Sequence, residues 1–322
     1  MQELKTEKVA VIGSGNMGAS IAEVLASNGL TVFLVDLNRN LIDGAMKRIS
    51  EIASRQEKFI QSRSRREIQR IEAMGITLTE EQRKAIDKNL SAPAVSGFTD
   101  EVLQRIVPTT DYGVLSGCSF VFEAVFEKME VKKELLANLS KVLDHDTIVA
   151  SNTSSLSISE FANFYAHPEN VIIAHFFNPP YTLPLVEVVP GLRTSRETVD
   201  RTFAILSRLR NHRTEMKPVL VRESPGFIVN RILVPMINEA IELYGEGIAS
   251  REDIDLAMKL GAGMPMGPLE LADMVGLDVL LDVASVFESD FGDQKYRAPY
   301  NLKRMVWGGY LGKKNGKGIY DY

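Results

Sequence analysis

Two apolar runs near the amino terminus predict the first strands of a buried sheet. Residues 9–12 read Val-Ala-Val-Ile and end at a glycine, and residues 31–36 read Thr-Val-Phe-Leu-Val-Asp. A continuous apolar run is typical of a parallel strand that is buried on both faces. Between the two runs, apolar side chains recur at the spacing of a helix, at Met17, Ile21, Val24 and Leu25. The pattern therefore predicts a β-α-β unit.

The same alternation continues along the chain as far as residue 222. Further runs with strand character occupy residues 120–125, 147–151, 171–175, 183–189 and 219–222. Helical patterns lie between most of them, notably at 131–143 and 195–210. Strands that alternate with helices predict an α/β fold, here a doubly wound sheet of the Rossmann type.

A helical hairpin at residues 38–90 is expected to interrupt this alternation. Apolar side chains follow a helical spacing at Leu41, Ala45, Ile49, Ile52, Phe59 and Ile60. This spacing predicts a helix that reaches toward residue 72 and is broken by Gly75. Thr79 and Gln82 then form a candidate capping box that opens a return helix.

The hairpin also carries an excess of positive charge. Between residues 47 and 70 there are eight lysines and arginines against three glutamates. This excess has two interpretations. Either the helix exposes a solvated charged face, or the hairpin is a binding surface for a polyanionic ligand.

Strand patterns end at the Pro-Gly pair of residues 225–226, and helical patterns replace them. The expected helices cover 227–244, 252–260, 269–283 and about 302–311. Pro235 should kink the first of these helices, because proline lacks a donor N–H and crowds the preceding turn. Residues 1–222 are thus expected to form the Rossmann-type domain, and residues 223–322 an all-α second domain.

Composition narrows the functional classes. A chain of 322 residues is long for one hydrophobic core, which supports two domains. The single cysteine, Cys118, excludes an intrachain disulfide and favours a cytoplasmic protein. The net charge of −5 argues against general nucleic-acid binding. The first five residues do not resemble a signal peptide, and no apolar run approaches the ~20 residues of a membrane helix, so no membrane partner is expected.

The segment that joins the first strand to the first helix is rich in glycine. Its residues Gly13, Ser14, Gly15, Asn16, Met17 and Gly18 fit the pattern G-x-G-x-x-G. The first glycine permits a tight turn, the second lets a pyrophosphate approach the backbone, and the third lets the helix pack on the strand. Asp36 follows Gly13 by 23 residues, at the end of the second strand. A carboxylate there binds ribose hydroxyls and repels a 2′-phosphate, so the predicted cofactor is NAD rather than NADP.

His175 and Glu187 are the candidate catalytic pair. His175 ends one predicted strand, and Glu187 is the one charge in the next. If these strands form a hairpin around Tyr181, the two side chains face each other, and a buried glutamate needs such a partner. The carboxylate would fix the imidazole tautomer and stabilise its cation, as a general base for an alcohol proton requires. The alternative is a structural histidine beside a glutamate that points to solvent. No metal is expected, because metal-ligand spacing is absent among the other histidines, His145, His167 and His212.

Several motifs in a fixed order resemble those of the L-3-hydroxyacyl-CoA dehydrogenase family over nearly the full length. They are GSGNMG at 13–18, SNTSSL at 151–156, AHFFNPP at 174–180, PGFIVNR at 225–231, GMPMGP at 263–268 and GKKNGKG at 312–318. The resemblance implies an NAD-dependent enzyme that interconverts a (3S)-3-hydroxyacyl-CoA and a 3-oxoacyl-CoA. It also implies a homodimer formed through the helical domain.

The resemblance assigns catalytic and substrate-binding roles to individual residues. His175 corresponds to the catalytic base of the family and Glu187 to its carboxylate partner. Ser154 corresponds to the residue between nicotinamide and substrate, and Asn230 to the asparagine that helps hold the substrate in the second domain. Asn178 is expected to shape the floor of the site.

The resemblance also assigns residues to the cofactor side. Glu127 and Lys132 correspond to cofactor-side residues after the fourth strand, and Lys314 to a C-terminal lysine that reaches back to the cofactor. Lys128 stands where the family usually has asparagine, which weakens the assignment of Glu127. The hairpin is longer than in many relatives, so no individual contact to coenzyme A carries over.

Two other functions fit part of the pattern. The segment at residues 178–187 also resembles dehydrogenases of small free hydroxy acids, such as gulonate dehydrogenase of the lambda-crystallin group. Phe176 and Phe177 favour the acyl-CoA branch. A non-catalytic NAD-binding module is the second alternative, and the joint presence of Ser154, His175, Glu187 and Asn230 argues against it.

Overall fold

The computed structural model describes residues 7–90 and 97–322. The first five residues, which are not expected to form a signal peptide, lie outside the described residues. Two compact units make up the chain. Unit 1 comprises the residues up to Thr153 together with Ile158–Val221, and unit 2 comprises Ser154–Ser157 together with Arg222–Tyr322. Among the described residues, no helix has both the length and the apolar character needed to cross a membrane.

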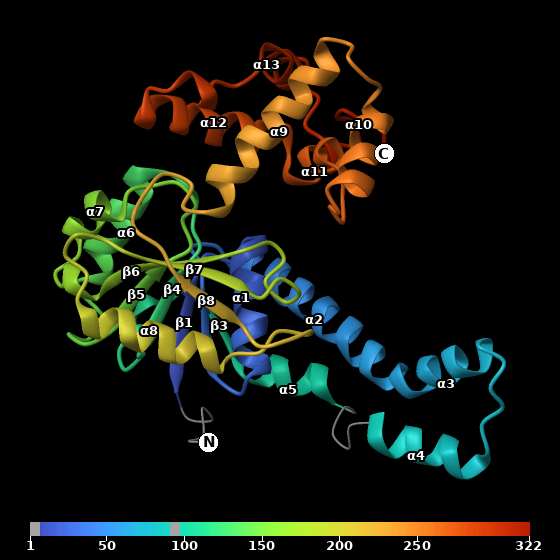
Figure 1. Ribbon diagram of the computed structural model, residues 1–322. Coiled ribbons are helices and arrows are strands. Elements are labelled where there is room, and N and C mark those ends of the chain that lie inside the picture. The colour runs from blue at the N-terminus through green and yellow to red at the C-terminus, as the bar shows by residue number, and fades with distance from the viewer. Residues whose placement is uncertain (1–6, 91–96) are drawn as a thin grey trace. The chain divides into compact units, whose positions relative to one another are not determined.

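Unit 1 is built on one sheet (Figure 1). Among the described residues, eight strands form it in the order β3-β2-β1-β4-β5-β6-β7-β8. The strands are β1 (Lys8–Ile12), β2 (Thr31–Val35), β3 (Ile106–Thr109), β4 (Phe120–Glu123), β5 (Ile148–Ser151), β6 (Val171–Phe176), β7 (Leu185–Pro190) and β8 (Lys217–Leu220). Neighbouring strands are parallel except β6 and β7, which are antiparallel. The doubly wound α/β sheet predicted from the sequence is confirmed.

Strand β3 is absent from the sequence prediction, and its place in the sheet explains why. It lies at the edge, where it pairs only with β2 in the described sheet. Ile106 is buried, Val107 is 40 % exposed and Pro108 has no N–H to donate. An edge strand of this kind needs no apolar run, so the pattern that identified the central strands does not detect it.

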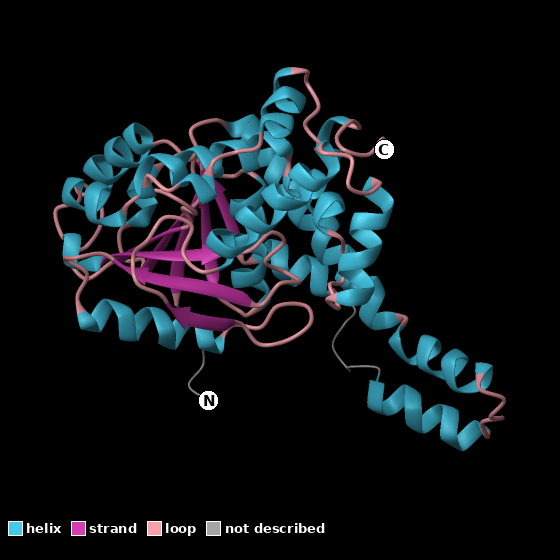
Figure 2. Ribbon diagram, turned by 45° about the horizontal axis from the view of Figure 1, so that its top comes forward, coloured by secondary structure: helices cyan, strands magenta, loops and turns pink. Residues whose placement is uncertain are grey.

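Unit 1 also contains helices, several of which pack against its sheet (Figure 2). They are α1 (Asn16–Ser27), α2 (Arg39–Gln61), α3 (Arg63–Ala73), α4 (Glu80–Leu90), α5 (Phe98–Gln104), α6 (Met129–Leu139), α7 (Ile158–Phe161) and α8 (Arg196–Arg208). Helix α1 packs on β1 and β2, and α8 packs on β6, β7 and β8. The core lies at these contacts, where side chains such as Val9, Ile21 and Leu25 are completely buried.

The predicted hairpin is formed by α2, α3 and α4. The first helix breaks at Ser62 instead of continuing toward residue 72, and α3 packs against α4. The capping box is confirmed, because the N–H of Thr79 donates to Oε1 of Gln82 at 2.9 Å and the N–H of Gln82 donates to Oγ1 of Thr79 at 3.2 Å. All side chains of α4 are exposed or half-buried, so little apolar burial holds this part of the hairpin.

Unit 2 is helical, as predicted. Its helices are α9 (Val229–Gly245), α10 (Arg251–Gly261), α11 (Pro268–Val275), α12 (Leu277–Phe291) and α13 (Tyr300–Trp307). They enclose a second core that includes Ile237, Leu269 and Phe287. The expected single helix at 269–283 is wrong, because Gly276 takes φ +105° and divides α11 from α12. Helix α9 continues through Pro235, and the kink stays a prediction.

Candidate active site

The glycine-rich loop has the geometry of a dinucleotide site. Gly13 adopts φ +96°, and a Cβ on it would lie 2.4 Å from the carbonyl oxygen of Ala124. A Cβ on Gly18 would lie 1.8 Å from the carbonyl oxygen of Gly13. Around Gly15, by contrast, no described atom comes within 4 Å of such a Cβ. Two glycines thus allow close packing, and the middle one leaves open space at the start of α1, where backbone N–H groups can bind a phosphate.

Asp36 joins this loop from the end of β2. Its Oδ2 accepts hydrogen bonds from the backbone N–H and the hydroxyl of Ser14, each at 2.7 Å, and its Oδ1 accepts one from the N–H of Leu37 at 2.7 Å. Arg48 of α2 donates from Nη2 to the carbonyl oxygen of Ser14 at 2.6 Å. In the sequence, Arg48 is one of the basic residues of the hairpin. Linear spacing does not reveal its contact with the glycine loop.

A buried ion cluster lies after β4. Nζ of Lys132 is 2.8 Å from both carboxylate oxygens of Glu123 and 3.4 Å from Oε2 of Glu127. The hydroxyl of Ser151 donates to Glu123, and the hydroxyl of Thr153 donates to Oε1 of Glu127 at 2.6 Å. Only 2 % of Lys132 is exposed, whereas the side chain of Glu127 is 38 % exposed. Lys132 therefore holds Glu127 in position, and Glu127 is the most exposed of the three charged side chains.

Sequence reasoning missed Glu123, although a signal was present. Glu123 is the single charge at the end of the apolar strand β4, as Glu187 is in β7. A carboxylate in such a strand requires a partner when it is buried. The same argument that identified Glu187 would have identified Glu123, but not its partner, which comes from the following helix.

His175 and Glu187 lie side by side on β6 and β7. They are directly paired in the antiparallel register, and Nδ1 of His175 is 2.9 Å from Oε2 of Glu187. His175 is 7 % exposed and Glu187 is completely buried. The ring of Phe177 lies 4.7 Å from the imidazole, centroid to centroid. The predicted hairpin register is confirmed, and with it the close contact of the two side chains.

The polar residues that follow β5 and β6 surround this end of the sheet. Oδ1 of Asn152 accepts a hydrogen bond from the N–H of Phe176 at 2.8 Å, which ties the end of β6 to the residue after β5. Asn178 is exposed in the β6–β7 loop and has a cis peptide bond to Pro179. Carboxyl ends of parallel strands are where α/β sheets bind their ligands.

The remaining predicted site residues belong to unit 2. Ser154 is in the short segment Ser154–Ser157 that groups with this unit. Asn230 lies in the first turn of α9. Lys314 forms an ion pair with Asp278 of α12 through both carboxylate oxygens. The structure therefore brings together His175 and Glu187 in unit 1, and it places Ser154, Asn230 and Lys314 in unit 2.

Comparison with known proteins identifies the family. The model described as the NAD binding domain of 3-hydroxyacyl-CoA dehydrogenase matches residues 8–223, and the model of the C-terminal domain of the same enzyme matches residues 226–322. The chain belongs to the 3-hydroxyacyl-CoA dehydrogenase family. It is accordingly an NAD-dependent enzyme, and the open space beside Gly15 fits that cofactor.

Individual relatives match the chain over almost its full length. A 3-hydroxybutyryl-CoA dehydrogenase from Clostridioides difficile is 40% identical over 98% of this chain and 99% of its own. The human mitochondrial hydroxyacyl-coenzyme A dehydrogenase is 38% identical over 100% of this chain and 93% of its own. The crystal structure of (S)-3-hydroxybutyryl-CoA dehydrogenase from Ralstonia eutropha superposes with a TM-score of 0.82 at 35% identity, covering 98% of this chain and 99% of that one.

Unit 1 contains a cavity of about 250 Å³ beside the β6–β7 loop. It is lined by Ile52, Arg55, Gln56, Phe59, Tyr181, Thr182, His212 and Arg213. Nε2 of His212 is 2.8 Å from Oε1 of Glu23, which is completely buried. The guanidinium groups of Arg55 and Arg213 thus line the same cavity as the rings of Phe59 and Tyr181. Sequence reasoning located the basic helix but not the side chains opposite to it.

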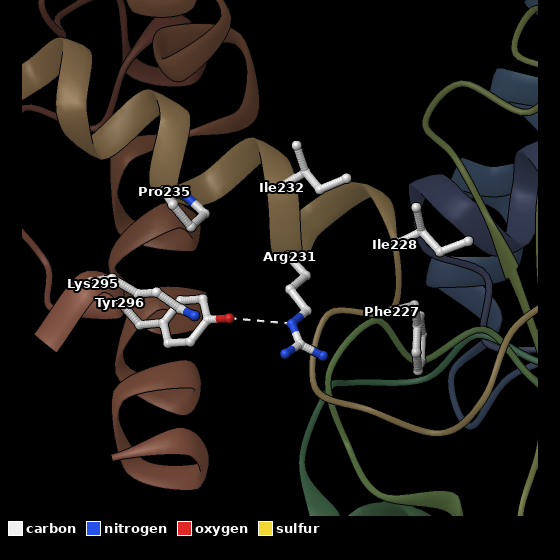
Figure 3. A pocket seen from close by; sticks show the side chains of 7 residues that line it. All are labelled: Phe227, Ile228, Arg231, Ile232, Pro235, Lys295 and Tyr296. Atoms are coloured by element: carbon white, nitrogen blue, oxygen red, sulfur yellow. Dashed lines mark hydrogen bonds between the residues drawn. The ribbon is translucent and has the colours of Figure 1, made fainter. Parts of the chain in front are cut away.

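Unit 2 contains a second cavity, of about 470 Å³, at the start of α9 (Figure 3). It is lined by Phe227, Ile228, Arg231, Ile232, Pro235, Lys295 and Tyr296. Nε of Arg231 donates to the hydroxyl of Tyr296 at 3.2 Å, and Nη1 donates to the hydroxyl of Ser224 at 2.9 Å. Phe227 has φ +51°, an uncommon angle for a residue other than glycine. This cavity shares the first turn of α9 with Asn230.

Proposed function

We propose that the protein interconverts a (3S)-3-hydroxyacyl-CoA and the corresponding 3-oxoacyl-CoA, with His175 and Glu187 as the acid–base pair. The observation that carries the proposal is the buried contact of 2.9 Å between the two side chains in a chain of this family. A free imidazole at a strand end could serve many roles. One that is fixed by a buried carboxylate is suited to take up and return a proton.

Bound NAD supplies the acceptor for the hydride that leaves C3 of the substrate. His175 takes the proton of the 3-hydroxyl through Nε2 as the carbon–oxygen double bond forms. Glu187 accepts a hydrogen bond from Nδ1–H of His175 and stabilises the imidazolium that forms. In the reductive direction, the imidazolium returns its proton to the oxygen as the hydride is added to C3.

Further residues orient the two substrates in this proposal. Ser154 and Asn230 bind the hydroxyl and the thioester carbonyl, and Asn178 forms the floor of the site. On the cofactor side, Glu127 contacts NAD. Lys132 acts indirectly by holding Glu127, because its ammonium is buried against two carboxylates. Lys314 would have to exchange its ion pair with Asp278 for a cofactor contact.

Coenzyme A is proposed to bind at the cavity between α2 and the β6–β7 loop. Arg55 and Arg213 can pair with phosphate groups, and Phe59 and Tyr181 offer rings against which adenine can stack. The relatives named above act on CoA thioesters by name. A free hydroxy acid would leave these four side chains without a ligand, so the CoA thioester is preferred over the free acid.

We further propose a cytoplasmic homodimer that forms through unit 2. Large apolar side chains are exposed there, among them Ile232 at 66 %, Leu260 at 78 % and Trp307 at 70 %. Such a density of exposed apolar side chains marks an interaction surface. The single cysteine, Cys118, is buried and suits a reducing compartment.

One experiment tests the proposed reaction. Purified protein is assayed for NADH oxidation with acetoacetyl-CoA, with longer 3-oxoacyl-CoA esters, and with the free 3-oxo acids. Turnover should require the CoA thioester. Efficient turnover of the free acids, with no gain from the thioester, would favour the free hydroxy acid dehydrogenase instead.

A further inference from the structure

Three potential metal ligands meet in unit 1, away from the proposed active site. His145, His167 and Glu169 each offer one ligand atom, and these atoms all lie within 4.8 Å of one another. His145 lies in the loop before β5, and the other two lie immediately before β6. Because β5 and β6 are parallel neighbours, the loops that precede them meet at the amino ends of these strands. His175 lies near the opposite, carboxyl end of β6.

Linear spacing conceals this cluster, since two of its members are 22 residues apart, from 145 to 167. In the fold, the rings of His145 and His167 lie 4.2 Å apart, centroid to centroid. Nδ1 of His167 is 3.5 Å from Oε1 of Glu169. In a tetrahedral zinc site with bonds of about 2.0–2.2 Å, two ligand atoms are roughly 3.3–3.5 Å apart. The distance between Nδ1 of His167 and Oε1 of Glu169 therefore already suits two ligands of one zinc ion.

The backbone around the cluster is held in place by other hydrogen bonds. Nδ2 of Asn170 donates to the carbonyl oxygen of His145 at 2.7 Å, which ties the two loops together. The carbonyl oxygen of Glu169 accepts from the N–H of Ser195 at 2.9 Å and from the hydroxyl of Thr198 at 2.8 Å. The ligands can thus be brought into contact with a metal by side-chain rotation, and the exposed His145 has the space to rotate.

Tyr165 provides a separate observation at the same place. Its ring packs against His167 with centroids 6.0 Å apart, it is 3 % exposed, and its hydroxyl has no hydrogen-bond partner among the described residues. The hydroxyl is therefore a buried donor without an acceptor. A ligating carboxylate or a metal-bound water would satisfy it, as second-layer groups do in metal sites.

We propose that His145, His167 and Glu169 bind one Zn²⁺ ion, with water in the fourth position. Two imidazole nitrogens and one carboxylate oxygen suit zinc, whereas calcium and magnesium prefer oxygen ligands. The ion would link the loop before β5 to the segment before β6, and its role is structural. The ion would lie at the amino ends of β5 and β6, whereas His175 lies near the carboxyl end of β6, so the ion takes no part in hydride transfer.

The test uses the full chain, freed of metal with a chelator and titrated with ZnCl₂ by isothermal calorimetry at pH 7.5. One equivalent should bind with micromolar or tighter affinity and raise the melting temperature. His145→Gln and Glu169→Gln should each weaken binding at least tenfold. Glu130→Gln, which removes an exposed carboxylate on α6, is the matched control and should bind as the wild type does.

His175→Gln separates this site from the active site, because it abolishes the proposed acid–base chemistry but should leave zinc binding unchanged. Circular dichroism of the metal-free variants verifies that each is folded. Zinc affinity that is unchanged in both His145→Gln and Glu169→Gln overturns the proposal. So does an equal loss of affinity in Glu130→Gln, or the absence of saturable binding to the wild type.

Discussion

His175 and Glu187 place a titratable ring against a carboxylate where water hardly reaches. Their exposed fractions are 7 % and 0 %, and Nδ1 lies 2.9 Å from Oε2. In the neutral imidazole, Nδ1–H donates to the carboxylate and Nε2 carries the lone pair. When the ring takes the proton of an alcohol, the buried carboxylate stabilises the new cation, because opposite charges attract strongly where water is excluded.

Substitutions of this pair should separate proton transfer from charge stabilisation. His175→Gln should lower kcat by roughly 10²–10⁴-fold, which is the usual contribution of general acid–base catalysis. NADH affinity should be kept. Glu187→Gln should lower the rate of oxidation, because the imidazolium that forms in the reaction loses the carboxylate that stabilises it. Steady-state kinetics of both variants measure these effects. An unchanged rate in Glu187→Gln would exclude the proposed pair.

Lys132 is a second buried charge that is stabilised by charges of opposite sign, here in a structural role. Its ammonium is buried between Glu123 and Glu127, and removing it would leave a fully buried carboxylate without a cation. Such a loss usually costs more than the ion pair itself contributes, because the remaining charge keeps its desolvation penalty.

Lys132→Met should therefore reduce the free energy of unfolding by about 3–5 kcal/mol. Lys133→Met is the matched control, since this neighbour pairs with the half-exposed Glu160. An exposed pair contributes within about 1 kcal/mol. Urea unfolding of both variants gives the comparison. Equal losses of stability would show that the buried cluster has no special cost.

At the level of single residues, the sequence predicts pairs whose register can be counted. His175 and Glu187 lie on consecutive strands, so their pairing follows from a hairpin around Tyr181. The contact of Arg48 with Ser14 and that of Lys132 with Glu123 join a helix to a strand end or a loop. Their geometry depends on how each helix packs, which no periodicity specifies.

Among the elements, the hairpin carries basic side chains with different surroundings. On α2, Arg48 contacts the glycine loop and Arg55 lines the cavity, whereas Arg66 of α3 lies over the ring of Phe59 at 3.9 Å. Arg63 and Arg65 are exposed on α3. We therefore expect the two interpretations of the basic hairpin, a ligand surface and a solvated face, to apply to different residues.

Charge reversal can distinguish these residues. Arg55→Glu with Arg213→Glu should raise KM for the acyl-CoA about tenfold or more, equivalent to ~1.4 kcal/mol, and should leave KM for NADH within about twofold. The effect should grow at low salt. Arg63→Glu with Arg65→Glu, the matched control, should have a smaller effect. Initial-rate kinetics at two ionic strengths provide the measurement. A larger effect from the control pair would move the coenzyme A site onto α3.

Local chemistry explains which elements the sequence predicts. The capping box at Thr79 and the glycine turn at Gly13 are encoded by neighbouring residues, and both form as expected. The end of α11 is not encoded in this way, because Gly276 resembles a tolerated glycine within an apolar helix. Packing decides it: Gly276 turns the chain at φ +105°, and the N–H of Leu277 donates to the carbonyl oxygen of Leu311.

For the whole molecule, the loss of strand patterns after residue 222 predicts where the helical unit begins. The second core, around Ile237 and Phe287, is separate from the core of unit 1. The grouping of Ser154–Ser157 with unit 2 is not visible in the sequence, because it depends on contacts such as that of Ser157 with Glu223 at 2.7 Å. Exposed apolar side chains on unit 2 are likewise a property of the assembled fold.

Those exposed side chains make the proposed dimer testable. Ile232 on α9 and Trp307 on α13 are 66 % and 70 % exposed, and a charge placed in an apolar contact must lose its hydration when the subunits meet. Ile232→Glu and Trp307→Glu are therefore made singly, and at least one of them should shift the sedimenting species from dimer to monomer at micromolar protein. Leu192→Glu is the control, because Leu192 is a 91 % exposed leucine of unit 1. A wild type that sediments as a monomer, or a dimer that only Leu192→Glu disrupts, would rule out assembly through unit 2.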